Sequence, residues 1–384
     1  MKKKCGIVTI ATGANYGNRL QNYALQSVVK KMGYIAETID YIPSYSDKKE
    51  KISKIDKVKN KILRCKKMGI SYIWKILQKN TFKKKIIQEK ESYREKCFKN
   101  FISNYIKISD KTYNCKSNLK ELNDLYNVFI VGSDQVWNPY WEGKDEIFYL
   151  TFTDKKNRIA YAPSFGVSQI PDQQKNFYKK CISEISNISV REEKGKEIIQ
   201  ELTGRNAQVV LDPTFLLRKE EWNQAVKEPV ISKKYLFTYF LGILSAKRKR
   251  QIKKFAKMHN LEIISMYEFW DENSSFGGPS EFLGLIKNAE YICTDSFHGA
   301  VFSIIYNKPF TVMEREDIKN QKEKKMNSRI ETLLKNLHLQ QCKEFLNKNE
   351  QGKFIIDYMD TNKEIENKRR ESLEYLRSSL DKAK

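Results

Sequence analysis

Apolar and polar positions alternate at the start of the chain in blocks that have the lengths of strands, loops and helices. An apolar run at residues 6–10 predicts a strand, and a polar, glycine-bearing stretch at 11–19 predicts a loop. Residues 20–32 have helical spacing, and residues 36–41 form a second strand-length apolar run. The chain therefore begins with a predicted strand–helix–strand unit.

Short apolar runs that end in polar or glycine residues continue along the chain. They predict strands at residues 128–132, 158–162, 187–191 and 208–212. The segments 173–185 and 194–202 between them have helical spacing. Alternating strands and helices predict a parallel sheet with helices on both faces, so functional side chains are expected just after the strands.

A second unit of the same kind is predicted from Tyr235 onward. A strand near residues 235–241 is followed by a helix at 246–259, a strand at 262–266 and an apolar run that begins at Ala289. The sequence thus predicts an α/β fold with domains at residues 1–225 and 226–345. Residues 346–384 are expected to form a C-terminal helical extension, with one closing helix from Lys363.

Residues 48–103 interrupt the first domain with a basic segment, which we interpret as a helical insertion. About half of the net charge of +24 comes from this region. A basic face could bind an anionic membrane surface or an acidic polymer, or could simply be solvated. Lysine and isoleucine are abundant throughout the chain, which favours the solvated face. Nucleic acid is not expected as a partner, because no recognisable nucleic-acid-binding motif occurs in the segment.

The seven cysteines lie far apart, and no two form a C-x-x-C pair. Neither a disulfide framework nor a metal site is predicted, and a reducing cytoplasm fits this pattern. The N-terminal apolar run has the length of a strand rather than of a signal peptide. No stretch approaches the roughly 20 apolar residues that span a bilayer. We therefore expect a cytoplasmic protein that could meet the inner membrane face only from its surface.

His298 follows a predicted strand and lies at the start of a helix, within the segment Cys293-Thr-Asp-Ser-Phe-His-Gly. Free backbone N–H groups at a helix start favour phosphate or carboxylate, and imidazole can carry a proton near neutral pH. The alternative is a helix cap with a histidine whose hydrogen bonds are satisfied. The other two histidines, His259 and His338, occupy ordinary helix or helix-end positions, so we favour a catalytic role for His298.

Two further strand ends carry polar groups. Arg191 could grip a carboxylate or phosphate, or could pair with one of the glutamates that follow it. Asp134 could accept a proton or hold a sugar hydroxyl, and Trp137 offers a flat apolar face that suits a sugar ring. Alternatively, Asp134 caps a helix and Trp137 belongs to the core.

The polar loop after the first strand contains Asn15, Asn18 and Arg19, which could bind hydroxyls or an anion. The loop lacks the glycine patterns of dinucleotide and P-loop sites, so it does not indicate a nucleotide cofactor. The alternative is a capped turn.

Seven segments, in this order, resemble the polysaccharide pyruvyltransferase family. They are N-Y-G-N-R-L-Q-N-Y-A-L, V-G-S-D-Q-V-W-N-P, Y-A-P-S-F-G, S-V-R-E, L-D-P-T-F-L-L, T-D-S-F-H-G-A and N-S-R-I-E-T-L-L. The resemblance spans roughly residues 5 to 340. It implies a fold similar to GT-B, with two Rossmann-like domains facing across a cleft, the first on the acceptor side and the second on the donor side.

The resemblance also assigns roles to residues. It implies that His298 is catalytic and that Arg191 binds phosphoenolpyruvate, while Ser133 and Ser164 lie in matching segments and are candidate substrate contacts. Family members can carry arginine where this chain has Ser296, so one anion contact is missing. Ser296 stays a candidate substrate contact, and Arg329 or Arg19 could replace the missing arginine.

The implied reaction transfers the pyruvyl group of phosphoenolpyruvate to two hydroxyls of a glycan acceptor as a ketal. The acceptor could be lipid-linked, and no cofactor is needed beyond the donor substrate. His298 is the expected acid or base, with Asp134 orienting or deprotonating the acceptor. The rival interpretations are a glycosyltransferase that uses a nucleotide sugar, and a noncatalytic protein that binds acidic polymers or membranes.

Overall fold

Two parallel β-sheets organise the computed structural model, which describes residues 2–43, 81–140, 145–266, 274–315 and 328–383. The first sheet has the strand order β3-β2-β1-β4-β5-β6-β7. Its strands are β1 (Lys4–Val8), β2 (Ile35–Ile42), β3 (Ile108–Asn114), β4 (Val128–Val131), β5 (Arg158–Ala160), β6 (Asn187–Val190) and β7 (Gln208–Val209). All neighbouring pairs are parallel.

The second sheet has the order β10-β9-β8-β11-β12, and its neighbours are also parallel. Its strands are β8 (Tyr235–Tyr239), β9 (Glu262–Met266), β10 (Ser274–Ser275), β11 (Tyr291–Thr294) and β12 (Phe310–Val312). The central strands β4 and β8 are buried along their whole length, as expected of sheets that are covered on both faces. The predicted fold class is therefore confirmed in its two Rossmann-like α/β units, each built on a parallel sheet.

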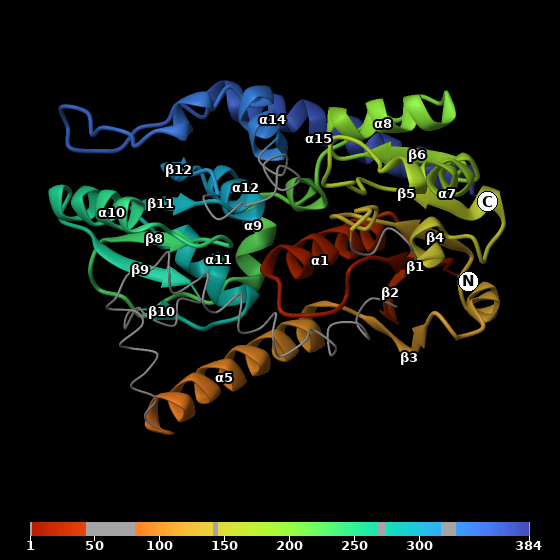
Figure 1. The fold of residues 1–384 in the computed structure, drawn as a ribbon, viewed down its shortest axis with the longest axis horizontal. Coiled ribbons are helices and arrows are strands. Elements are labelled where there is room, and N and C mark those ends of the chain that lie inside the picture. The colour runs from red at the N-terminus through yellow and green to blue at the C-terminus, as the bar shows by residue number, and fades with distance from the viewer. Residues whose placement is uncertain (1, 44–80, 141–144, 267–273, 316–327, 384) are drawn as a thin grey trace.

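Helices cover both sheets (Figure 1). The first unit contributes α1 (Tyr16–Lys31), α5 (Thr81–Tyr105), α6 (Leu122–Leu125), α7 (Asp172–Ser183), α8 (Glu193–Thr203) and α9 (Lys219–Trp222). The second contributes α10 (Ala246–Met258), α11 (Pro279–Asn288), α12 (Phe297–Ile305) and α14 (Ser328–Asn336). Short 3-10 turns lie at Leu119–Glu121, Glu146–Tyr149, Lys155–Asn157, Pro213–Leu216, Asn223–Ala225 and Gln340–Lys343. The predicted domain division after residue 225 falls between the fifth of these turns and β8.

The first helix begins earlier than the sequence pattern predicted. Asn15 caps α1 by accepting a hydrogen bond from the Asn18 backbone N–H, so the helix starts at Tyr16 instead of Leu20. The first turn contains buried polar residues, so it lacks the alternation of apolar buried and polar exposed positions from which the helix was predicted. Asn18 and Arg19 are consequently helical residues, and the polar loop is shorter than expected.

The predicted helical insertion is described only in part. Its last portion belongs to α5, which runs beyond the predicted end at residue 103 to Tyr105, whereas residues 48–80 lie outside the described residues. Arg94 of α5 donates to the hydroxyl of Tyr16 on α1, and that hydroxyl donates to the carbonyl of Gly277 next to α11. Helix α5 therefore connects to both units (Figure 1).

The closing helix α15 (Met359–Lys382) crosses from the second unit back to the first. Near its start, Thr361 donates to the Leu337 carbonyl of the second unit. Farther along, Tyr375 donates to the carbonyl of Ala160 in β5, and the Leu380 carbonyl accepts from Tyr34. The expected C-terminal helix exists, and it completes the core of the first unit.

Candidate active site

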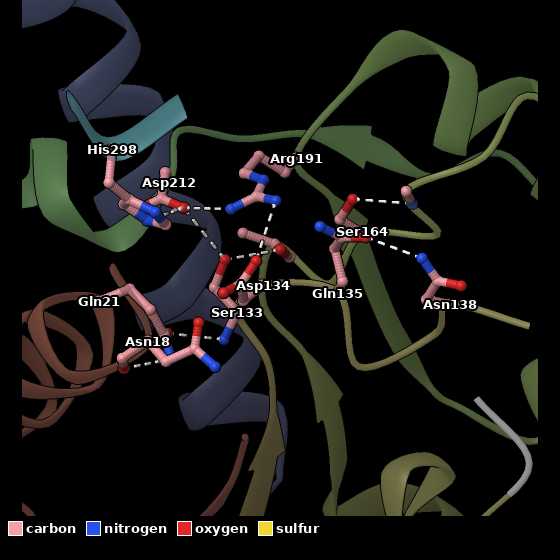
Figure 2. Close-up of polar contacts among 12 residues, drawn as sticks. Asn18, Gln21, Ser133, Asp134, Gln135, Asn138, Ser164, Arg191, Asp212 and His298 are labelled. Carbon is pink, nitrogen blue, oxygen red and sulfur yellow. Dashed lines mark hydrogen bonds and ion pairs between the residues drawn. The ribbon is translucent and has the colours of Figure 1, made fainter. Parts of the chain in front are cut away.

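The carboxyl ends of the first sheet gather the candidate side chains in one place (Figure 2). Ser133 and Asp134 follow β4, Ser164 follows β5, and Arg191 follows β6 directly. All four residues are buried. The structure thus brings together, at one sheet edge, the polar strand-end residues that the sequence singled out.

Asp212, which was not among the candidates, joins these groups. It follows β7 in the segment Leu211-Asp-Pro-Thr, and its side chain is 1% exposed. Its Oδ1 accepts from the backbone N–H of Thr214 at 3.0 Å and from the Thr214 hydroxyl at 2.7 Å. Its Oδ2 accepts from Arg191 Nη1 at 2.6 Å and from the Ser133 hydroxyl at 3.4 Å. Asp212 is therefore the central acceptor of the cluster.

The charge of Asp212 is set by its neighbours. Burial favours the neutral acid, but His298, Arg191 and Thr214 outweigh burial and hold the pKa of Asp212 well below its usual range. The group is a carboxylate at neutral pH.

Arg191 lies among three carboxylates. Besides the bond to Asp212, its Nη2 is 3.4 Å from Asp134 Oδ1, and its Nε is 3.7 Å from Glu192 Oε2. Burial lowers the pKa of Arg191, but these carboxylates outweigh burial and raise it. The sequence left open a salt bridge to a following glutamate; the shortest ion pair is to Asp212 instead. The Nε makes no hydrogen bond, and its nearest charged neighbour is Glu192.

His298 enters this cluster from the second unit, in the first turn of α12. Ser296 is the helix cap and accepts from the backbone N–H of Gly299. The His298 Nε2 lies 3.7 Å from Asp212 Oδ2, beyond hydrogen-bond distance, and it has no other partner. The alternative of a satisfied capping histidine therefore does not describe this residue, since Ser296 caps the helix and Nε2 is unsatisfied.

Gly17 of α1 provides the space for the imidazole. A Cβ atom at this position would lie 1.9 Å from His298 Nδ1, so any side chain would collide with the ring. The contact places the N-terminal end of α1 against His298, across the two units.

Arg329 of α14 provides a second guanidinium near Arg191. Both cations lie over the ring of Phe297, at 4.6 Å for Arg191 and 6.0 Å for Arg329. Burial and the charge of Arg191 lower the pKa of Arg329 to about 10. The Gln135 amide oxygen, when turned toward Arg329, accepts from its Nη2 at 2.9 Å. A cavity of ≈ 130 Å³ is lined by both basic and acidic side chains, together with Phe297 and residues of α14 and α15. The charged side chains are Arg191, Arg329, Lys368, Asp212, Glu192, Glu193 and Glu371.

A model of the family described as polysaccharide pyruvyl transferase matches residues 15–317. The chain belongs to this family. The match includes His298, Arg191 and Asp212, so the family's characteristic region contains the cluster in Figure 2.

Several solved structures are similar in outline to this family member. A UDP-N-acetylglucosamine 2-epimerase from Rickettsia bellii has 13% identity and a TM-score of 0.46, covering 99% of this chain and 97% of its own. The corresponding epimerase from Neisseria meningitidis has 10% identity and a TM-score of 0.44, covering 90% and 95%. Phytolacca americana UGT2 has 11% identity and a TM-score of 0.35, covering 97% and 94%. A search of curated proteins found no match.

The two arginines considered as substitutes at the Ser296 position differ in placement. Arg329 lines the cavity beside Arg191. Arg19 instead donates from Nη2 to the Gly13 carbonyl at 2.8 Å, and burial, opposed by the charge of Asp40, lowers its pKa to about 10. Of the two, only Arg329 lines the same cavity as Arg191.

The remaining polar candidates are held by the protein itself. Ser133 donates to the Ala162 carbonyl at 2.8 Å, and Ser164 donates to Glu192 Oε1 at 2.6 Å. Asn18 is buried, whereas Asn15, the N-cap residue of α1, is exposed. The two serines therefore fix the loops of the site.

Trp137 does not offer a face to a sugar ring. It is fully buried, its indole N–H donates to the Phe148 carbonyl at 2.8 Å, and its ring stacks on Tyr149 at 5.8 Å between centroids. The alternative that the sequence left open, a core residue, describes its position. Asp134 likewise caps no helix, since residues 132–140 contain none.

Sequence reasoning missed Asp212, Gly17 and Gln21. Asp212 satisfies the criterion that selected Arg191, a polar residue at a strand end, and could have been found by it. Gln21 donates to Thr9 at 2.8 Å and accepts from the backbone N–H of Ser133 at 3.1 Å. These contacts join residues far apart in the sequence, although Gly17 and Gln21 both lie in the segment N-Y-G-N-R-L-Q-N-Y-A-L that carries the family resemblance.

The described residues contain neither a candidate metal-binding cluster nor a candidate membrane-spanning helix. No group of three or more His, Cys, Asp or Glu side chains among them could hold a metal ion. No described helix has the length and apolar character needed to cross a membrane.

Proposed function

We propose that this chain transfers the pyruvyl group of phosphoenolpyruvate to two hydroxyls of a cell-surface polysaccharide or its lipid-linked precursor, forming a ketal. The observation that carries the proposal is the buried cluster in which Asp212 lies 2.6 Å from Arg191 and 3.7 Å from His298. It combines a proton carrier from one unit with an anion-binding group from the other, at the edge where α/β sheets hold ligands.

The donor site is proposed at the cavity between Arg191 and Arg329. Arg191 is already paired with Asp212, Asp134 and Glu192, whereas burial and the charge of Arg191 lower the pKa of Arg329, so an anion in this cavity would gain most from Arg329. The Nε atom of Arg329 makes no hydrogen bond within the protein and is a donor that a ligand could use. At ≈ 130 Å³ the cavity suits a small anion, whereas sites for larger ligands usually have about 300–1,000 Å³.

The chemistry follows from the donor. His298, as imidazolium, gives a proton to the methylene carbon of phosphoenolpyruvate, and the adjacent carbon becomes cationic. A sugar hydroxyl adds to that carbon and loses its proton to the neutral imidazole, which restores the acid. The C–O bond to phosphate then breaks, a second hydroxyl adds, and its proton leaves with the phosphate. Asp134, 3.4 Å from Arg191, is proposed to orient the acceptor hydroxyl.

Calorimetric titration tests the donor assignment. We expect the wild type to bind phosphoenolpyruvate in preference to UDP-sugars. Arg329→Gln and Arg191→Lys should each weaken binding about tenfold or more, because each alters a charge-assisted hydrogen bond. The matched control is Arg370→Gln, an exposed arginine of α15.

Two results would contradict the proposal. Preference for a UDP-sugar, with release of nucleoside diphosphate, would indicate a glycosyltransferase. Tight binding of acidic polymer without release of phosphate from phosphoenolpyruvate would indicate a noncatalytic protein.

A further inference from the structure

Asp212 uses its two oxygens differently. Oδ1 is fixed within the first unit by the backbone N–H and the hydroxyl of Thr214. Oδ2 faces outward from that anchor, toward Arg191 at 2.6 Å and toward the imidazole of His298 at 3.7 Å. The orientation of the carboxylate is therefore set before the second unit's histidine meets it.

The imidazole of His298 is confined on two sides. Nε2 is directed at Asp212, and Nδ1 lies against Gly17 at the start of α1. A neutral imidazole has one nitrogen with a proton and one with a lone pair. A carboxylate only accepts, so it favours the form in which the nitrogen facing it bears the proton.

We propose that Asp212 is the positioning residue of this site: it keeps a proton on His298 Nε2, so that Nδ1 is the atom that exchanges a proton with substrate. The inference rests on the proposed function, because it takes His298 as the acid and base of pyruvyl transfer. The proton passed to the donor leaves Nδ1, the proton from the acceptor hydroxyl returns to Nδ1, and the proton on Nε2 stays in place throughout.

The same arrangement couples the two proposed roles. Oδ2 also binds Arg191, so one carboxylate oxygen orients both the anion-binding group and the proton carrier. Because His298 belongs to the second unit and Asp212 to the first, the orientation exists only when the two units are in contact.

Nitrogen-15 NMR of histidine-labelled protein tests the inference independently of turnover. The chain has three histidines, so the signals of His298 can be identified by their loss in His298→Gln. At a pH where the ring is neutral, we expect the wild-type His298 to carry its proton on Nε2. In Asp212→Asn, whose amide can also donate, the Nδ1-protonated form should increase. A wild-type ring with its proton on Nδ1, or an Asp212→Asn spectrum identical to the wild type, would overturn the proposal.

Kinetics provide the second measurement. Asp212→Asn should lower kcat by about a hundredfold, with a smaller change in the KM for phosphoenolpyruvate. The matched control is Asp145→Asn, a buried aspartate of the first unit that accepts from the Tyr41 hydroxyl, and it should retain wild-type kcat. An unchanged kcat in folded Asp212→Asn would refute the role. Absence of transfer by the wild type would instead reject the proposed function, and the NMR result would decide on Asp212 alone.

Discussion

Two strand-end segments of this molecule each carry a buried aspartate, and the two aspartates contact different kinds of groups. Asp295, after β11, accepts from the backbone N–H groups of Leu241 at 2.7 Å and Gly242 at 2.8 Å, and lies 3.4 Å from Arg315. All of these belong to the second unit. Asp212, after β7, contacts side chains of both units.

The difference shows that burial of a carboxylate at a strand end does not by itself mark a functional group. Asp295 fixes the loop after β8 through backbone amides and pairs with Arg315 of the same unit. Asp212 fixes side chains that can bind an anion and carry a proton. The chemistry of the partners separates the two roles.

The largest effect is expected at His298, which lies in the same segment as Asp295. If its imidazole carries the proton, His298→Gln should lower the rate of pyruvyl transfer by about 10²–10⁴-fold. Phosphate release from phosphoenolpyruvate with a glycan acceptor measures it. His338→Asn, which changes an exposed histidine with a positive φ, should have the wild-type rate. A His298→Gln rate near that of the wild type would remove His298 from the mechanism.

The pH dependence of stability probes Asp212 directly. Its pKa is lower in the folded state than in the unfolded chain, so its stabilising effect is complete above the unfolded value of about 3.9 and is lost as pH falls below it. Asp212→Asn should therefore lower the free energy of unfolding by about 3 kcal/mol at pH 7. Urea unfolding should show this difference narrowing below about pH 4. A difference that stays constant into acid would mean that the carboxylate charge is not what stabilises the fold.

Gly17→Ala examines the contact that joins the two segments. Within a helix alanine normally stabilises relative to glycine. Here the added Cβ would displace the ring of His298, so we expect a loss of about 2 kcal/mol together with reduced transfer. Chemical denaturation measures the change in the free energy of unfolding. A variant more stable than the wild type would show that the ring is not confined at Gly17.

Trp137→Phe has the smallest expected effect. It tests whether Trp137 is a core residue or contacts the acceptor. It leaves the Phe148 carbonyl without its indole donor, which should cost about 1 kcal/mol of stability. The KM for the acceptor should not change. An increased acceptor KM at unchanged stability would return Trp137 to the substrate-binding surface.

Most of the fold could be predicted from the sequence because central parallel strands are continuous apolar runs. Strand β3 was not predicted, because it lies at the sheet edge and its central residues Asp110–Thr112 are exposed. Strand β12, three residues long, was also not predicted.

The site was predictable only as far as its location at the strand ends. Trp137 could not be assigned to core or surface from its neighbours in sequence. The contact of Gly17 with His298 joins residues from different units, and only the packed structure brings them together.

The crossing of α15 has a consequence for how the protein is made. Leu376 and Leu380 belong to the same core cluster as Leu25 and Ile159 of the first unit. The ribosome delivers these leucines only after the whole second unit. The first unit therefore cannot complete its interior during its own synthesis, and its apolar surface stays uncovered until α15 emerges.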